Sequence, residues 1–278
     1  MPANRSNTQL FALAQPPPAE LVLRGRRYRL EKVFKHDFFA ATALYAAETP
    51  GEGFPRLVAK FGRQQDFCGL PGAWVGRLLR RREERVHRRL DGIVGVQRWA
   101  GRLSDSAYAL VYMDGRTLDT LRQPPPAGFF DHLRTILDAI HARQAAYCDL
   151  HKRSNIQVTP DGRPGLIDFQ VSVLGPPSLA LRGLRGRWLA YLQQMDLYHL
   201  YKHKRRLAPQ ELRPEELDLS RRRGALVRLH RGLVTPLRAL RRRFLSRQHR
   251  LGRLVSPSAE LETHEQPEKS TWQKPAQG

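Results

Sequence analysis

Apolar and polar positions alternate most clearly near the start of the chain. Over 27–34 the sequence RYRLEKVF alternates between polar and apolar residues, which is typical of a half-buried strand. A loop with glycine and proline then precedes the apolar segment 57–59, which predicts a second strand leading into Lys60. Further short strands are predicted at 96–100 and 107–113, so the first part of the chain is expected to form a small antiparallel sheet.

Helical spacing of apolar residues predicts two helices among and after these strands. The second runs from Ala127 to Gln144, and the region beyond Pro177 is helical, rich in arginine and divided by further prolines. Between them, 156–159 and 166–167 predict a short two-stranded unit. The apolar stripe of the first helix, with arginines filling its other face, consists of Trp74, Leu78, Leu79, Val86 and Leu90. A strand-rich first half and a helical second half predict an α+β fold with two lobes.

The balance of charge changes the expectation for partners. The chain has 48 Lys and Arg against 26 Asp and Glu, a formal net charge of +22, which favours nucleic acid, anionic lipid headgroups or phosphorylated glycolipids. The stretch 221–250 combines leucines at helical spacing with clusters of arginine. It is interpreted as a helix with a solvated face, and alternatively as an interfacial helix on anionic membrane. Nucleic acid is not favoured, because this stretch lacks a set of aromatic residues for stacking.

The cysteine content and the lengths of apolar runs indicate where in the cell the protein is expected. The two cysteines, Cys68 and Cys148, are too few for a disulfide framework and badly spaced for zinc. No run of apolar residues is long enough for a transmembrane helix, and the first residues lack the pattern of a secretory signal. A cytoplasmic protein is expected, with peripheral association at the inner membrane as a further option.

The sharpest chemical pattern is YCDLHKRSNIQV, followed by a Pro-Asp-Gly turn and LIDFQ. It places Asp149, Asn155 and Asp168 in order, on either side of a strand, turn and strand. His141 stands eight positions before Asp149. The whole set resembles the catalytic loop and metal-binding strand of the protein-kinase superfamily. The resemblance covers roughly 28–172 and implies a protein-kinase-like fold, with a small antiparallel-sheet N-lobe and a mainly helical C-lobe.

The resemblance also implies roles for these residues. Asp149 would be the catalytic base, and Asn155 and Asp168 would be metal ligands. Phosphoryl transfer requires neutralised phosphate charge and an oriented hydroxyl group, with little covalent chemistry from the protein. Amide and carboxylate oxygens suit Mg²⁺, so ATP and Mg²⁺ are the expected cofactors.

Nucleotide-binding residues are expected from the same resemblance. Lys60 resembles the strand lysine that contacts the phosphates, and its expected partner is Glu83, with Glu84 as the alternative. The segment containing Val111 and Met113 resembles the hinge, where backbone groups bind adenine. A further phosphate contact is expected from the loop 35–42, through Lys35 or through backbone amides.

The pattern departs from the family in three respects. The spacing from Asp149 to Asn155 is one residue longer than usual, no glycine-rich loop follows the first strand, and no activation segment with an Ala-Pro-Glu motif is present. The departures favour the atypical bacterial branch, similar to lipopolysaccharide core and Kdo kinases, with RIO-type kinases as the next nearest. The expected acceptor is a glycolipid sugar. The alternatives are a Ser/Thr protein kinase, or an inactive pseudokinase that binds RNA or anionic membrane.

The expected domain organisation follows from these elements. It consists of a flexible leader at 1–20, an N-lobe at 21–113, a C-lobe with basic C-terminal helices at 114–253, and a disordered tail at 254–278.

Overall fold

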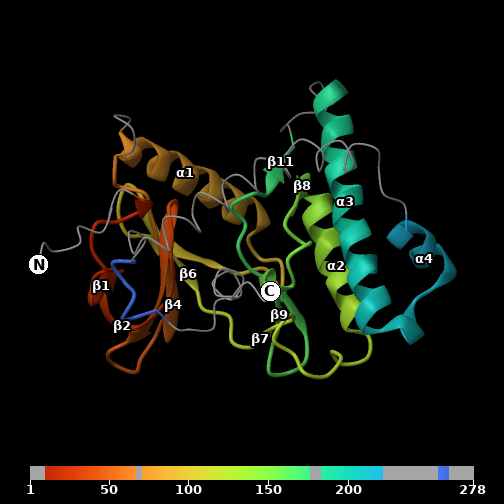
Figure 1. The fold of residues 1–278 in the computed structure, drawn as a ribbon, viewed down its shortest axis with the longest axis horizontal. Coiled ribbons are helices and arrows are strands. Elements are labelled where there is room, and N and C mark those ends of the chain that lie inside the picture. The colour runs from red at the N-terminus through yellow and green to blue at the C-terminus, as the bar shows by residue number, and fades with distance from the viewer. Residues whose placement is uncertain (1–9, 67–70, 176–182, 222–255, 263–278) are drawn as a thin grey trace, which may run out of the picture. The chain divides into compact units, whose positions relative to one another are not determined.

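The structure is a computed structural model that describes residues 10–66, 71–175, 183–221 and 256–262 (Figure 1). They fall into two compact units. The sheet unit holds the described residues up to Arg81, together with Ala100–Tyr112 and 256–262. The helical unit holds Arg82–Trp99 and the described residues from Met113 onward to 221.

One six-stranded sheet dominates the sheet unit, in the order β1-β2-β3-β4-β6-β5. Its strands are β1 (Glu20–Leu23), β2 (Arg26–His36), β3 (Ala40–Ala47), β4 (Arg56–Gly62), β5 (Trp99–Arg102) and β6 (Ala107–Val111). The pairs from β1 to β4, and β4 with β6, are antiparallel. β2 and β4 were predicted from their apolar patterns. β1 and β3 were not, because the β3 sequence AATALYAA is almost uniformly apolar and shows no alternation.

The core of the sheet unit combines small and large side chains. Alanines from β3, β4 and β6 are fully buried beside aromatic rings, and the Tyr45 hydroxyl donates to the Pro18 carbonyl over 2.7 Å. Alanine on several strands leaves room for those rings, so the sheet is packed without a regular run of large aliphatic residues.

Helices and two small groups of strands make up the helical unit. The helices are α1 (Gly72–Leu90), which begins in the sheet unit, α2 (Phe129–Ala142), α3 (Gly183–Leu207) and α4 (Pro214–Arg221). The strands are β7 (Arg116–Thr117), β8 (Ala145–Ala146), β9 (Ile156–Val158), β10 (Pro164–Leu166) and β11 (Val173–Leu174). β9 pairs with β7 and β10, and β8 pairs with β11. Two short 3₁₀ turns lie at Arg153–Asn155 and Pro209–Glu211.

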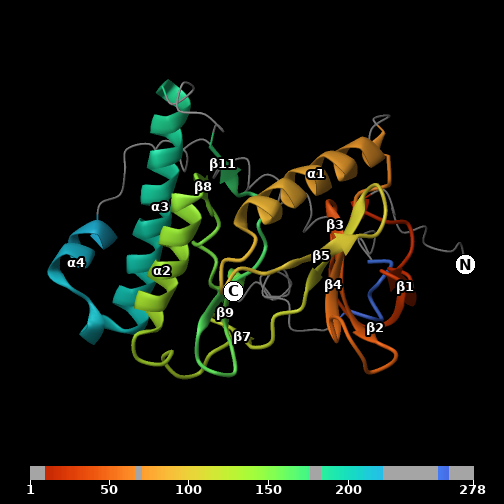
Figure 2. The same cartoon turned by 180° about the vertical axis from the view of Figure 1, so that it is seen from behind.

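α2 and α3 run side by side through the helical unit, as Figures 1 and 2 both show. The apolar face of α2 predicted from the sequence is buried, and Leu133, Leu137 and Ile140 are fully inaccessible. The buried Lys204 of α3 joins the other helices, because its Nζ lies 2.8 Å from Asp131 of α2 and 2.9 Å from Glu216 of α4. A mainly helical second half is therefore held by both apolar packing and ion pairs.

The predicted apolar stripe of α1 is wrong in its first half. Trp74 and Leu78 are exposed to 49% and 50%, whereas Val86 and Leu90 are buried as expected. The first half of the helix instead packs through Gly76, where an added Cβ would lie 2.5 Å from the carbonyl oxygen of Arg63. Such a close backbone contact requires glycine. The buried face in the first half of α1 is therefore the face that carries Gly76, and not the predicted face with Trp74 and Leu78.

The ends of the described chain lie on the sheet unit. Phe11, Ala12 and Leu13, within the predicted leader, are buried, and Ser258 and Glu262, within the predicted tail, are buried as well. Residues 1–9, 254–255 and 263–278 of these two predicted segments, and most of the predicted helix at 221–250, lie outside the described residues. Within the described ranges, none of the helices combines the length and the apolar character needed to cross a membrane. The predicted α+β class, with an antiparallel sheet first and helices later, is confirmed.

Candidate active site

Asp149 and Asn155 meet in the helical unit despite the longer spacing between them. The 3₁₀ turn Arg153–Asn155 folds the chain back, and the Asn155 amide Nδ2 donates to Asp149 Oδ2 over 2.7 Å. Both side chains are buried, with exposures of 4% and 7%. The two predicted residues are therefore neighbours in the structure.

Two cationic or polar side chains flank the Asp149 carboxylate. Lys152 Nζ lies 2.9 Å from Oδ2, and His151 Nδ1 lies 3.3 Å from Oδ1. Both of these side chains are 44% exposed, so they reach from solvent to a carboxylate that is itself buried. The arrangement fixes the orientation of Asp149 and places a lysine ammonium group beside it.

Asp168 is held close to Asn155 by the pairing of β9 and β10. Leu166 of β10 stands opposite Ile156 of β9, and the Ile167 amide donates to the Asn155 carbonyl oxygen over 3.1 Å. Asp168 itself has a φ of 60°, in the left-handed region that residues other than glycine rarely adopt. Strained backbone of this kind is concentrated at functional sites.

The donor atoms around this hairpin fit a hard divalent cation. The Asn155 amide nitrogen is used in the bond to Asp149, so its carbonyl oxygen Oδ1 and the Asp168 carboxylate are the atoms that could hold a metal. Within the described ranges, no group of three or more His, Cys, Asp or Glu side chains is placed to bind a metal ion. Mg²⁺ accepts a small set of oxygen ligands and keeps several waters, so two protein ligands suit it.

Asp196 of α3 holds the segment before Asp149, and the sequence reasoning missed it. This fully buried carboxylate accepts hydrogen bonds from the Tyr147 and Cys148 amides, both over 2.8 Å, and lies 3.2 Å from His141 Nε2. Cys148 has a φ of 67°, so Asp196 stabilises a strained turn directly before Asp149. Asp196 is therefore a positioning residue for the candidate base.

A signal for Asp196 exists in the sequence. It stands in YLQQMDLYHLY, where it is the only acidic residue in a stretch of large apolar and aromatic residues. A buried aspartate is costly unless it is hydrogen-bonded, so such a residue should have backbone or side-chain partners.

Aromatic rings pack behind the candidate site. The Phe169 ring contacts Tyr147 at 5.0 Å and His87 at 5.2 Å between centroids. The Tyr147 hydroxyl donates to the Ile167 carbonyl oxygen, which ties the segment before Asp149 to the segment before Asp168. Burial, together with the nearby carboxylates, raises the pKa of Tyr147 well above its usual value, so this hydroxyl stays protonated.

Cys148 is not a candidate nucleophile. Burial, followed by the charge of Asp196, raises the pKa of the Cys148 thiol to about 12. Since the thiolate is the reactive form, the thiol is inert at neutral pH.

His203 of α3 is hydrogen-bonded to the segment that follows Asp149. Its Nε2 lies 2.8 Å from the Leu150 carbonyl oxygen, to which it donates. Burial lowers the pKa of His203 from 6.5 to about 4, and the charges of Arg153, Lys202 and Arg206 act in the same direction. The ring is therefore neutral in the native protein at neutral pH.

We expect a loss of stability in acid that depends on His203. Because the folded pKa lies below the unfolded one, stability falls as the pH decreases from 6.5 towards 4. The loss from this residue reaches roughly 3 kcal/mol in the free energy of unfolding. The His203→Gln variant, whose amide can still donate to Leu150, should lose this part of the pH dependence in urea unfolding measured from pH 7 to 4.

The control for this prediction is His132→Gln, a change of an exposed histidine on α2. The role of His203 is contradicted if both variants retain the pH dependence of the wild type.

The other predicted site residues are divided between the two units. Lys60 lies on β4 in the sheet unit, buried to 6% exposure and opposite Thr42 and Tyr108. Glu83 lies in the part of α1 that belongs to the helical unit, and its Oε1 is 3.8 Å from His87 Nε2. The pairing of Lys60 with Glu83 stays a prediction.

The expected hinge residues are likewise placed in both units. Val111 ends β6 and pairs with Leu57 of β4 in the sheet unit. Met113 belongs to the helical unit, where its Sδ would lie 2.1 Å from a Cβ added to Gly165. Glycine in β10 therefore allows the Met113 side chain to lie against that strand.

Lys35 lies near the end of β2, and the expected phosphate loop is shorter than the sequence suggested. β2 extends to His36 and β3 starts at Ala40, so only Asp37–Phe39 connects the two strands. The Lys35 ammonium group is 2.7 Å from the Asp37 carboxylate. The connection is thus a tight turn carrying two phenylalanines.

Comparison with known proteins gives similarity at the level of structure. No family model matches the chain, and no curated protein sequence matches it. Among solved structures, it is similar to the crystal structure of the BubR1 kinase domain, with a TM-score of 0.44 and 16% sequence identity. The match covers 69% of this chain and 65% of that one, which is less than two thirds of the length of that kinase domain.

Proposed function

We propose that the protein is a kinase that transfers the γ-phosphoryl group of ATP to a hydroxyl group, with Mg²⁺ as its metal. The observation that carries the proposal is the group formed by Asp149, Asn155 and Asp168 in the helical unit. The Asn155 Nδ2 atom is 2.7 Å from Asp149 Oδ2. The carbonyl oxygen of Asn155 accepts a hydrogen bond from the amide of Ile167, the residue before Asp168. The candidate base is thus hydrogen-bonded to one expected metal ligand, and the other expected ligand directly follows a residue that is hydrogen-bonded to the backbone of the first.

In this proposal the residues of the candidate site have separate roles. Bound Mg²⁺ would supply positive charge next to the phosphates, and Asn155 and Asp168 would hold it. Asp149 would accept a hydrogen bond from the attacking hydroxyl and take its proton as the oxygen bonds to the γ-phosphorus, while the bond from that phosphorus to the bridging oxygen breaks and ADP leaves. Lys152, whose ammonium group already lies beside Asp149, would attract phosphate oxygens to that position.

Further residues are assigned to the nucleotide in this proposal. Lys60 would contact the phosphates and Glu83 would orient it, while the backbone near Val111 and Met113 would bind adenine. Lys35 or the backbone of the β2–β3 turn would supply a further phosphate contact. These roles rest on the resemblance of the sequence to protein kinases.

For the acceptor, we favour the sugar of an anionic glycolipid of the lipopolysaccharide type. The net charge of +22 supports an anionic acceptor or membrane surface. A Ser/Thr side chain of a protein is the second acceptor class. The expected place of action is the cytoplasm, at the inner membrane face.

A pseudokinase is the second candidate function. It is favoured by the β2–β3 turn, where Asp37, Phe38 and Phe39 occupy the place of the glycines that allow a backbone to approach phosphates closely. Such a protein would use its basic surface to bind anionic membrane or RNA.

ATP-dependent thermal stabilisation distinguishes these functions. A ligand that binds only the folded protein stabilises it by about 2.7 kcal/mol at 100 times its Kd. We expect millimolar ATP to raise the Tm in the presence of Mg²⁺, and we expect Asp168→Ala to abolish the part that depends on the metal. Asp161→Ala, a change of an exposed aspartate in the neighbouring β9–β10 turn, should behave like the wild type.

The absence of any shift in the wild type would overturn the kinase proposal and favour the pseudokinase. A shift that Asp168→Ala leaves intact would refute the assignment of Asp168 to the metal. A metal-dependent shift leads to an acceptor screen that starts with lipopolysaccharide fragments and continues with proteins.

A further inference from the structure

The outer edge of β2 is covered by two different segments. β1 pairs with β2 from Arg26 to Arg29. Further along, the Val33 amide donates to the Leu261 carbonyl oxygen over 3.2 Å, and Val33 forms a parallel bridge with Glu262. Residues 256–262, which we name the C-terminal clip, thus contact the edge of β2 beyond the part that pairs with β1. Covering an edge in this way satisfies backbone groups that would otherwise be open to another strand.

His36 fixes the clip to the end of β2. Its Nε2 accepts a hydrogen bond from the Leu13 amide over 3.2 Å, so the ring proton must be on Nδ1. That nitrogen lies 2.8 Å from Ser258 Oγ and donates to it. His36 and Ser258 are both buried, with exposures of 5% and 1%. One neutral ring therefore connects the N-terminal segment, β2 and the clip.

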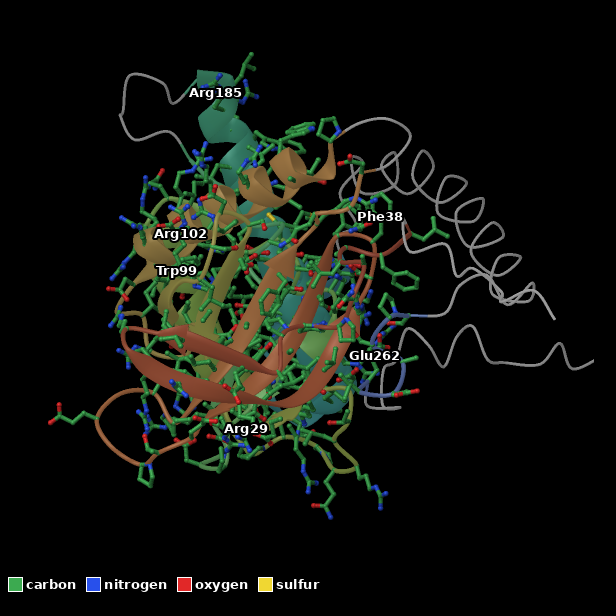
Figure 3. The ribbon with its side chains drawn as sticks, turned by 90° about the vertical axis from the view of Figure 1, so that its left-hand side faces the viewer. Arg29, Phe38, Trp99, Arg102, Arg185 and Glu262 are labelled. Atoms are coloured by element: carbon green, nitrogen blue, oxygen red, sulfur yellow. The ribbon has the colours of Figure 1, made fainter. Side chains whose placement is uncertain are left out.

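The clip has its own internal hydrogen bonds. The Glu262 amide donates to the Ser258 carbonyl oxygen over 2.9 Å, and the Ser258 amide donates to Ser256 Oγ over 3.2 Å. Ser258 and Glu262 are buried, whereas Ala259 and Glu260 face solvent. Figure 3 shows Glu262 at one side of the sheet, the same side as Phe38. The clip therefore has one defined face toward the sheet unit.

The segments that hold the clip also hold the β2–β3 turn. The Ala12 amide donates to the Asp37 carbonyl oxygen over 2.7 Å, one residue from Leu13, which contacts His36. The buried Arg63 donates to the Phe38 carbonyl oxygen over 2.9 Å, and its guanidinium carbon lies 3.9 Å from the Phe38 ring centroid. His36 directly precedes this turn. Loss of the clip would thus remove a support immediately next to it.

We infer that docking of the C-terminal clip onto Val33 and His36 sets the rigidity of the β2–β3 turn, and with it the affinity for nucleotide. The inference rests on the proposed function, because the turn stands where a kinase covers the phosphates of ATP. A turn that is already ordered binds phosphate without a further loss of conformational entropy. The clip is accordingly an activating element, and its release weakens nucleotide binding.

Protonation of His36 acts against docking. A second ring proton would face the Leu13 amide, which can only donate. Burial lowers the pKa of His36 from its usual value of 6.5, while the nearby carboxylates of Glu262 and Asp37 oppose this shift. The neutral ring that the clip needs is thus favoured above pH 6.5, and docking weakens as the pH falls below it.

The full-length variant Ser258→Asp tests the inference, with Ala259→Asp as the matched control. Both variants add one negative charge to the clip, but only the first places it in the buried contact with His36 and near Glu262. Hydrogen exchange of the amides of Val33 and of residues 37–39 reports docking, and titration with Mg-ATP reports affinity. We expect at least tenfold faster exchange in Ser258→Asp, and a Kd for Mg-ATP raised by about fivefold or more. Ala259→Asp should match the wild type in both.

Each outcome decides a different claim. Equal exchange in the two variants overturns docking of the clip. Faster exchange with an unchanged Kd for Mg-ATP overturns its control of nucleotide affinity. If the wild type binds no ATP while exchange still differs between the variants, the proposed kinase function fails and the docking of the clip stands.

Discussion

Replacement of Asp149 by asparagine is expected to lower the rate of phosphoryl transfer by roughly 10²–10⁴-fold, the usual contribution of a general base. Asparagine has almost the same shape but cannot take a proton from the attacking hydroxyl. Nucleotide binding should change little, because Asp149 is not among the residues assigned to ATP or to the metal. The measurement is kcat for transfer from γ-labelled ATP to a lipopolysaccharide fragment, together with the Kd for Mg-ATP.

The matched control is Asp138→Asn, the same chemical change at an exposed aspartate of α2 that pairs with Arg134. It should leave kcat and Kd unchanged. A rate for Asp149→Asn within about threefold of the wild type would show that Asp149 does not act as the base. A comparable loss of Mg-ATP binding would instead assign Asp149 to nucleotide or metal binding.

Local patterns predicted much of the helical unit and of its candidate site. α2 has a regular apolar stripe over 14 residues, and tertiary packing uses that same stripe. The 3₁₀ turn at Arg153–Asn155 places Asn155 beside Asp149, and the strands between Asn155 and Asp168 pair across a Pro-Asp-Gly turn. Where the local pattern and the tertiary contacts agree, the sequence alone is enough to predict the element and its buried face.

Other parts could not be predicted because their environment is set by distant residues. The buried stripe of α1 includes Gly76, which allows the close approach of the Arg63 backbone, a contact that no periodicity records. β3 is rich in alanine and lacks alternation because neighbouring rings fill the space around it. The clip at 256–262 is polar in sequence, and its burial depends on His36, more than two hundred residues away.

Asp196 has the largest expected effect on stability. In Asp196→Ala, the Tyr147 and Cys148 amides would stay buried without their acceptor, at a cost of about 1–3 kcal/mol for each N–H group. We therefore expect the free energy of unfolding to fall by about 2–6 kcal/mol, a large share of the roughly 5–15 kcal/mol of an ordinary domain. Urea unfolding measures this change as a lower midpoint with an unchanged m-value.

Asp196→Asn distinguishes positioning of the site from stability alone. Asparagine retains one acceptor oxygen, so this variant should stay folded at low temperature, but its amide nitrogen cannot accept the second of the two N–H groups. The strained turn at Cys148 would then lose one of its supports, and Asp149 would shift from its place beside Asn155. We expect kcat to fall at least tenfold while the Kd for Mg-ATP stays within about threefold, since displacement of a positioned catalytic group lowers the rate before it weakens binding.

The control is Gln194→Ala, a change of an exposed residue on the same helix. Loss of stability in Asp196→Asn with kcat unchanged would limit Asp196 to a structural role, and an Asp196→Ala variant as stable as the wild type would contradict even that.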